Sequence, residues 1–243
     1  PDPRMVLVPG EIRVTRSLAK RIRNGGFETR VDTAFAEVMR ACAAPRAGAS
    51  GTWISPAMVA ANPGEPILWW SPDPRMVLVP GEIRVTRSLA RRIRNGGFEA
   101  RVDTAFVEVM RACAAPREGA GGTWISPAMI AAYTRLFEAG WAHSMETWRD
   151  GQLVGGLYGV AIGRMFYGES MFSRESDASK VALVRLAQQL QRWGFGLIDC
   201  QMETPHLASL GARTLPRAVF TARLAELVNL PHRPGPWNFD VSD

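Results

Sequence analysis

The chain has 243 residues, of which 47% are hydrophobic, and a formal net charge of +6. This length and apolar share suffice for one large domain with a buried core. No apolar run approaches the roughly 20 residues that cross a bilayer, and the first residues lack the charged and then apolar pattern of a signal peptide. We therefore expect a cytoplasmic protein without a membrane partner. The positive charge favours an anionic partner such as nucleic acid, although many basic proteins bind none.

The cysteines and histidines are spaced too widely to suggest redox or metal chemistry. The three cysteines form no Cys-x-x-Cys pair, and two of them occupy the same position of a repeat. A disulfide framework is therefore not expected. The three histidines are equally scattered. We predict no metal site and no cofactor.

A near-identical internal repeat occupies the first half of the chain. Residues 1–61 and 72–132 match at an offset of 71 and differ at six positions. Two copies are too few for a solenoid, in which at least three units stack on one another. The second copy runs into an apolar helical pattern, whereas the first meets Asn62-Pro63-Gly64, which ends a helix. We therefore predict a poorly packed, duplicated βαβα segment at 1–61 and a complete domain at 62–243.

The complete domain is expected to begin with alternating strands and helices. In chain order these are a strand at 75–80, a helix at 86–95, a strand at 98–102, a helix after 103 and a helix at 126–140. Thr86 and Asp103 are the expected N-caps, because their side-chain oxygens can accept from the first free backbone N–H groups. Pro127 suits the first turn of its helix, where its missing N–H costs nothing.

A strand-rich block is expected to follow. Its elements are strands at 143–148, 152–162 and 164–171, a long helix at 177–193, a buried strand at 195–202, and short helices near 204 and 216. Arg149-Asp150-Gly151 is a turn of the hairpin type, and Gly155-Gly156 suggests a bulge or a close backbone approach to a ligand. An antiparallel block, a helix and another strand follow the order of acetyltransferase-like (GNAT) domains. We predict this α+β fold, with a mostly antiparallel sheet and flanking helices.

Four stretches carry a resemblance to a known family. They read PILWWSPDPR at 66–75, GTWI at 122–125, GESMFSR at 168–174 and LIDCQ at 197–201. In this order they resemble the bacterial leucyl/phenylalanyl-tRNA–protein transferase family. The resemblance implies transfer of Leu, Phe or Met from aminoacyl-tRNA to an acceptor protein with N-terminal Arg or Lys, which marks the acceptor for degradation. The first repeat copy stands where the family has its small N-terminal domain.

The resemblance implies a catalytic group at the end of the buried strand. Asp199 and Gln201 are two residues apart, so a strand directs both to one face. We hypothesise that they receive the attacking amine, Gln201 by hydrogen bonding and Asp199 by charge and proton uptake; alternatively they satisfy backbone groups at a strand end. Glu169 is placed in the same site to orient the amine or pair with the acceptor's basic side chain, unless it is a solvated turn residue. Cys200 points to the opposite face and is interpreted as core, not nucleophile.

The resemblance also implies an apolar pocket for the transferred side chain. Discrimination in such a pocket rests on shape and amounts to about 1–3 kcal/mol per methylene. The matching positions are Leu157, Phe166, Leu183 and Ile198. Periodicity alone cannot separate a pocket wall from ordinary core, so both interpretations stay open.

A basic helix face is the expected contact for tRNA. Arg87, Arg91 and Arg94 recur on one face, with Arg84 nearby. Guanidinium groups so arranged can bind the phosphates of an acceptor stem, but a solvated face is the simpler alternative. Trp124 is expected to stack on a terminal base or to serve as a buried anchor.

Two rival functions remain at this point. The first is an acyl-CoA N-acetyltransferase on the same fold, which needs a glycine-rich turn between strand and helix to bind pyrophosphate. The corresponding stretch, 171–177, contains no glycine, which argues against CoA. The second is a catalytically dead remnant that binds tRNA but transfers nothing.

Overall fold

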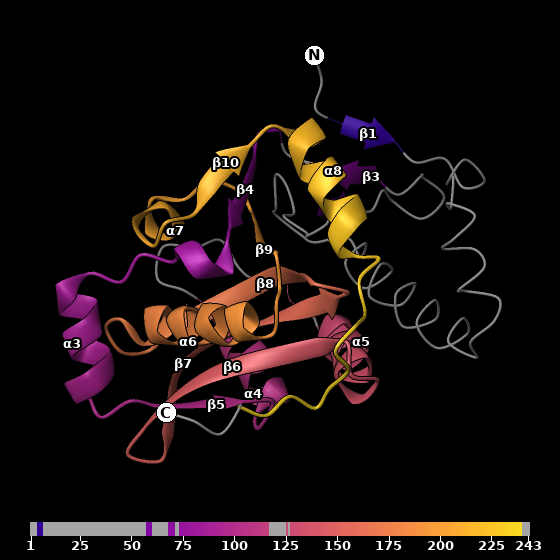
Figure 1. The fold of residues 1–243 in the computed structure, drawn as a ribbon. Helices are drawn as coiled ribbons and strands as arrows, with labels where there is room; N and C mark the ends of the chain where they lie inside the picture. Colours follow the sequence, from indigo (N-terminus) through magenta and orange to yellow (C-terminus); the bar gives the residue numbers. More distant parts are fainter. Residues whose placement is uncertain are drawn as a thin grey trace.

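The computed structural model describes residues 73–116, 125 and 127–239, and the backbone of three short strands before them (Figure 1). These strands are β1 (Arg4–Val6), β2 (Ala57–Val59) and β3 (Leu68–Trp70), which pair antiparallel in the order β1-β3-β2. The predicted segment 1–61 thus lies almost wholly outside the described residues. The boundary proposed near residue 62 remains a prediction.

A seven-stranded mixed sheet with the strand order β10-β4-β9-β8-β7-β6-β5 forms the body of the domain. The strands are β4 (Arg75–Leu78), β5 (Glu99–Val102), β6 (Ala142–Arg149), β7 (Gln152–Ile162), β8 (Met165–Ser173), β9 (Leu197–Gln201) and β10 (Arg213–Leu215). Within this sheet only β8 and β9 pair parallel. A parallel pair needs a crossover, which helix α6 (Ala178–Arg192) supplies. The predicted α+β, acetyltransferase-like order is confirmed.

Helices cover both faces of the sheet. Besides α6 they are η1 (Pro80–Glu82), α3 (Arg87–Asn95), α4 (Phe106–Ala114), α5 (Pro127–Glu138), α7 (Pro205–Ser209) and α8 (Arg217–Leu227). Helix α6 packs on one face, and α4 and α5 pack on the other (Figure 1). Neighbouring residues of β7 belong to different hydrophobic clusters: Leu157 packs with α6, and Tyr158 packs with α4 and α5. None of the helices in the described part is long and apolar enough to cross a membrane.

Several local predictions are confirmed. Thr86 caps α3, because its Oγ1 accepts from the backbone N–H of Leu89 at 3.2 Å. The β6–β7 hairpin turns at Asp150 and Gly151, whose φ values are 49° and 74°, as a two-residue turn requires. The expected bulge lies beside Gly155, where the register of β6 and β7 shifts. The close neighbour of Gly155 is helix α6, since a Cβ there would lie 2.6 Å from the Cβ of Ala178.

The cap predicted for α4 is wrong. Asp103 has a φ of 56° and directs its carboxylate to β6, where Oδ1 accepts from the backbone N–H of Ser144 at 2.9 Å. Glu146 of β6 takes the capping role, because its Oε1 accepts from the N–H groups of Thr104 and Ala105, both at 3.1 Å. A carboxylate satisfies free N–H groups at a helix start wherever it comes from in the chain. Local sequence does not reveal such a distant partner.

Candidate active site

The sheet opens between the two parallel strands. β8 and β9 pair over three positions, from Met165 opposite Leu197 to Tyr167 opposite Asp199. Beyond them β8 continues along β7, and β9 pairs with β4. A cavity of about 140 Å³ is lined by the residues that follow on both strands. The side-chain nitrogen of Gln201 spans the opening and donates to the carbonyl oxygen of Gly168.

All four residues predicted to form an apolar pocket line this cavity. Leu157, Phe166, Leu183 and Ile198 come from β7, β8, α6 and β9, and each is at most 4% exposed. An apolar cavity of about 150 Å³ can hold a benzene molecule. The cavity therefore has the size of one Phe or Leu side chain and is too small for a nucleotide.

Asp199 lies beside the cavity and forms a buried ion pair that was not predicted from the sequence. The partner is Arg75 of β4, whose Nε and Nη2 donate to Oδ1 and Oδ2 at 3.0 and 2.6 Å. Asp199 is 0% and Arg75 3% exposed. The backbone N–H of Gln201 also donates to Oδ1, at 2.9 Å. Because Arg75 and the backbone of Gln201 use both carboxylate oxygens, Asp199 has less bonding capacity left for a ligand than expected.

Strand alternation fails at the end of β9. Gln201 has a φ of 63°, so the chain leaves the extended conformation there. Asp199, Cys200 and Gln201 all line the cavity, and the prediction that Cys200 points away from the site is wrong. Burial, with a smaller effect of the Asp199 charge, raises the pKa of the Cys200 thiol. A thiol with a raised pKa is a poor nucleophile near neutral pH, which supports the view that Cys200 takes no part in covalent chemistry.

Glu169 is the carboxyl group with unused bonding capacity. It lines the cavity from β8, and the hydroxyl of Tyr133 on α5 hydrogen-bonds to it. Its Oε2 is buried and has no hydrogen-bond partner among the described residues. Burial first, and then the charge of Asp199, raise the pKa of Glu169 well above its ordinary value of 4.5. A raised pKa means that this carboxylate binds a proton more tightly than an exposed one does.

Tyr133 is a site contact that sequence analysis missed. It is 2% exposed and packs its ring edge-on to Tyr158, at 5.4 Å between ring centroids. In the sequence it belongs to an ordinary apolar helix stripe. The available signal was its hydroxyl, because a buried tyrosine hydroxyl usually needs a hydrogen-bond partner.

The predicted tRNA-binding arginines lie away from the cavity. Arg87, Arg91 and Arg94 are exposed on α3, and Arg84 is exposed just before it. They do not line the cavity, and α3 lies beyond one end of α6 (Figure 1). Trp124 lies outside the described residues. The choice between a tRNA contact and a solvated face therefore stays open for this helix.

The start of α6 does not suit a pyrophosphate group. In this fold an anion would bind to the free N–H groups at the helix N-terminus. Here the N–H of Ser179 donates to the Oγ of Ser173 at 3.2 Å. Two carboxylates stand at the same end: Glu175, paired with Arg149, and Asp177, which pairs within the helix. This use of the helix start by groups of the chain itself disfavours CoA.

These features define the class of protein. A mixed sheet opens at its parallel pair onto an apolar cavity, with two carboxyl groups and an amide at the cavity wall. Such a site can hold an apolar acyl group next to groups that orient and deprotonate an amine. The class is therefore an acyl-group transferase.

Comparison with known sequences gives the family. The sequence model of the leucyl/phenylalanyl-tRNA protein transferase family matches residues 6–62 and 77–225. A leucyl/phenylalanyl-tRNA–protein transferase of Thiobacillus denitrificans is 84% identical over 179 residues, which cover 74% of this chain and 78% of that protein. The corresponding protein of Nitrosospira multiformis is 64% identical over 179 residues, with 74% and 77% covered. The chain belongs to the leucyl/phenylalanyl-tRNA–protein transferase family.

Likeness to solved structures is weaker. A GCN5-related N-acetyltransferase from Kribbella flavida has a TM-score of 0.36 and 15% identity, covering 59% of this chain and 55% of that one. The structure of L-PGS from Bacillus licheniformis has a TM-score of 0.37 and 10% identity, covering 65% and 54%. No conclusion about substrates follows from these scores.

Proposed function

We propose that this chain transfers Leu, Phe or Met from aminoacyl-tRNA to the N-terminal Arg or Lys of acceptor proteins in the cytoplasm, and thereby marks them for degradation. The amine nitrogen of the acceptor attacks the ester carbonyl carbon and a C–N bond forms. The ester C–O bond breaks, and the 3′-hydroxyl of the tRNA leaves with a proton. The ester is already activated, so the protein needs only to orient the amine and handle its proton.

The cavity between β8 and β9 is the observation that carries this proposal. The cavity has an apolar wall and the volume of about one side chain, and the polar groups of Glu169, Asp199 and Gln201 line it as well. Leu, Phe and Met share an apolar side chain and differ in shape, which such a wall distinguishes. In our proposal the transferred side chain enters this cavity, with its ester facing the polar groups.

Each polar group then has a distinct role. The amide nitrogen of Gln201 is engaged by Gly168, which leaves its Oε1 to accept from the attacking amine. Glu169 takes up the proton at its buried Oε2, because its pKa is raised and this oxygen is unused by the described residues. Asp199 holds Gln201 in place and contributes charge rather than proton uptake, since Arg75 occupies its carboxylate. This division revises the role expected for Asp199.

Single-turnover transfer tests the proposal directly. Labelled Phe-tRNA and a peptide with N-terminal Arg should give the Phe-extended peptide, and a matched peptide with N-terminal Ala should give none. Gln201→Ala should slow the reaction and leave tRNA binding nearly unchanged. Binding of tRNA without transfer by the unmodified chain would identify it as a dead remnant. Acetylation of the peptide from acetyl-CoA would favour the rival acetyltransferase.

The basic face of α3 is proposed to bind the acceptor stem of the tRNA. Its arginines are exposed, and no ion pair joins them to other described residues. Reversing Arg87, Arg91 and Arg94 to Glu should weaken tRNA binding and flatten its salt dependence. Each lost phosphate contact removes about 0.9 from the log–log slope on duplex nucleic acid. An unchanged slope would show that this face is only solvated.

A further inference from the structure

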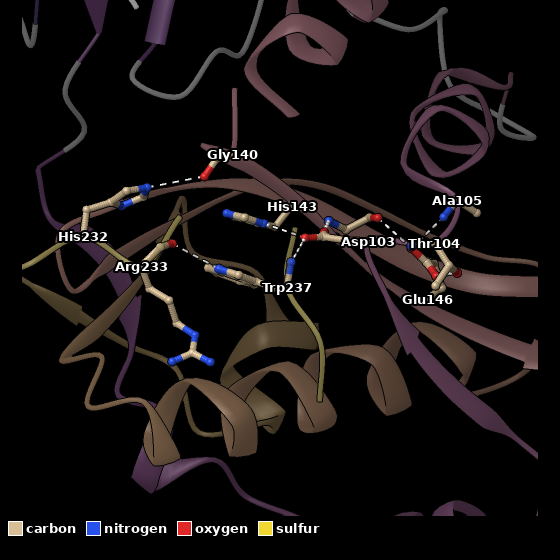
Figure 2. A network of polar contacts seen from close by, with 10 residues as sticks. Asp103, Thr104, Ala105, Gly140, His143, Glu146, His232, Arg233 and Trp237 are labelled. Atoms are coloured by element: carbon tan, nitrogen blue, oxygen red, sulfur yellow. Dashed lines mark hydrogen bonds and ion pairs between the residues drawn. The ribbon is translucent and has the colours of Figure 1, made fainter. Parts of the chain in front are cut away.

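The C-terminal segment 230–239, here called the strap, is irregular in backbone but firmly attached to the body (Figure 2). The strap follows α8 and crosses the domain beside β6. Its Trp237 is only 2% exposed and belongs to the same core cluster as Leu157, Leu183 and Ile198. A terminal segment with so deeply buried a side chain contributes to the interior and is more than a connection at the surface.

Hydrogen bonds and a stacked ring hold Trp237 at Asp103, at His143 and within the strap. Its backbone N–H donates to Oδ2 of Asp103 at 2.7 Å, and its indole Nε1 donates to the carbonyl oxygen of Arg233 at 3.1 Å. The same Asp103 oxygen contacts Nδ1 of His143 at 2.8 Å. The His143 ring stacks on the indole at 3.5 Å and 4°. Three contacts therefore hold the indole in place: the hydrogen bond of its backbone N–H, the hydrogen bond of its Nε1–H, and the His143 ring stacked on one face (Figure 2).

The same indole also contacts a residue in the wall of the cavity. Its centroid lies 5.0 Å from the Trp193 ring, 5.9 Å from Phe195 and 6.1 Å from Phe166. Phe166 is 1% exposed and lines the cavity between β8 and β9. A continuous series of packed rings thus runs from His143 of β6 through Trp237 of the strap to Phe166 at the cavity.

We propose that Trp237 is a specificity-determining positioning residue, which sets the shape of the aminoacyl cavity by supporting Phe166 from behind. Close-packed interiors transmit a change of volume to their neighbours. A smaller residue at 237 lets the Phe166 ring retreat into the space left behind, and the cavity grows. A larger cavity favours the bulkier Phe side chain over Leu. This inference rests on the proposed function, because it assumes that the transferred side chain enters the cavity.

The test compares two amino acids in one chain. The value of kcat/KM is measured for Phe-tRNA and for Leu-tRNA with the same Arg-starting peptide. For Trp237→Leu we expect the ratio of the first to the second to rise about tenfold, which is the order of the effect of one methylene in an apolar pocket. If this variant does not fold, Trp237→Phe removes less volume and should shift the ratio in the same direction. An unchanged ratio in a folded variant would overturn the proposal, whatever happens to its melting temperature.

A second strap residue provides the matched control. His232 stacks on Trp141 at 3.8 Å and 10°, and its Nε2 lies 3.3 Å from the carbonyl oxygen of Gly140. It does not line the cavity. His232→Ala should loosen the strap and lower the melting temperature, yet leave the Phe-to-Leu ratio as in the unmodified chain. Equal shifts of the ratio in both variants would mean a general loosening and would overturn a specific role for Trp237.

A binding experiment separates this inference from the proposed function. The methyl esters of L-phenylalanine and L-leucine carry the transferred side chains without RNA, and their stabilisation of the protein can be read by thermal shift. In Trp237→Leu the phenylalanine ester should gain relative to the leucine ester, and in His232→Ala it should not. Absence of transfer with this binding pattern would reject the proposed function but retain the cavity-shaping role. Identical ester preferences in all three proteins would reject the role of Trp237.

Discussion

Two clusters of buried polar residues lie on the same sheet and differ in how fully their carboxylates are used. In the junction cluster, Asp103 and Glu146 tie the start of α4 and the strap to β6 (Figure 2). Both oxygens of each carboxylate contact donors: those of Asp103 at Ser144, Trp237 and His143, and those of Glu146 at Thr104, Ala105 and Ser144. The site cluster consists of Glu169, Asp199 and Gln201 at the cavity. There, Oε2 of Glu169 has no hydrogen-bond partner among the described residues.

The difference teaches how to separate structural from functional carboxylates. Buried polar groups are nearly always hydrogen-bonded, so an unused buried oxygen calls for an explanation. Asp199 resembles the junction carboxylates, because Arg75 and the backbone of Gln201 donate hydrogen bonds to its two oxygens. Glu169 is the exception, and it faces a cavity. Variants of the two clusters test this distinction, and a variant of the neighbouring strap sharpens it.

The largest effect is expected from Asp199→Ala. It leaves the Arg75 guanidinium, 3% exposed, without its partner, and breaking a buried pair in this way costs about 3–5 kcal/mol. Denaturant unfolding should show this loss, and single-turnover transfer should fail. The double variant Arg75→Met/Asp199→Leu is the control, because an apolar replacement of a buried pair is often neutral or better for stability. Restored stability without restored transfer would separate the two roles; full transfer by the double variant would remove Asp199 from the site.

Glu146→Ala should cost somewhat less stability and no chemistry. It deprives the N–H groups of Thr104 and Ala105 of their acceptor, and lost bonds to a charged group are worth about 1.5–3 kcal/mol. The free energy of unfolding should fall by this amount, while the transfer rate per folded molecule stays unchanged. A reduced rate in fully folded protein would contradict the structural assignment of this cluster.

Glu169→Gln should reverse the pattern, with a large loss of transfer and a small change in stability. Removal of a general base slows a reaction by about 100-fold or more. Because the folded-state pKa of Glu169 is raised, the unfolded chain loses this proton first as the pH rises above 4.5, and the folded state is progressively destabilised. Melting temperatures at pH 5 and pH 8 should therefore fall less with pH in the variant than in the unmodified chain. Equal slopes would show that this carboxyl is not buried as described.

The smallest effect concerns His232 in the strap beside the junction cluster. Burial lowers the pKa of His232 to about 4, from 6.5. As the pH falls from 6.5 towards 4 the unfolded chain binds this proton first, so stability present above pH 6.5 is lost. His232→Phe keeps a ring against Trp141 and cannot titrate. Between pH 7 and pH 5 its melting temperature should fall by about 3 °C less than that of the unmodified chain, as measured by circular dichroism.

Much of the fold follows from local sequence, because local contacts decide it. Thr86 caps its helix through a residue three positions away, and Asp150-Gly151 turns the hairpin through its own backbone conformation. The cavity residues were located by resemblance to a family, with motifs such as GESMFSR and LIDCQ. Periodicity alone did not separate Phe166 from ordinary core, since a core residue and a cavity wall are equally apolar and equally buried.

The sequence by itself determined the family, the order of the elements and, through the resemblance, Glu169, Asp199, Gln201 and four apolar residues at the cavity. Only the tertiary structure decided which of them are free to act. Arg75 binds the carboxylate of Asp199, although the two residues are 124 positions apart in the sequence. Glu146 takes the place of the expected local cap, although it lies about 40 positions from the start of α4. The oxygen of Glu169 stays unused although it is buried. Hydrogen-bond saturation depends on donors that folding brings from distant segments, and no local pattern of residues records where those donors will lie.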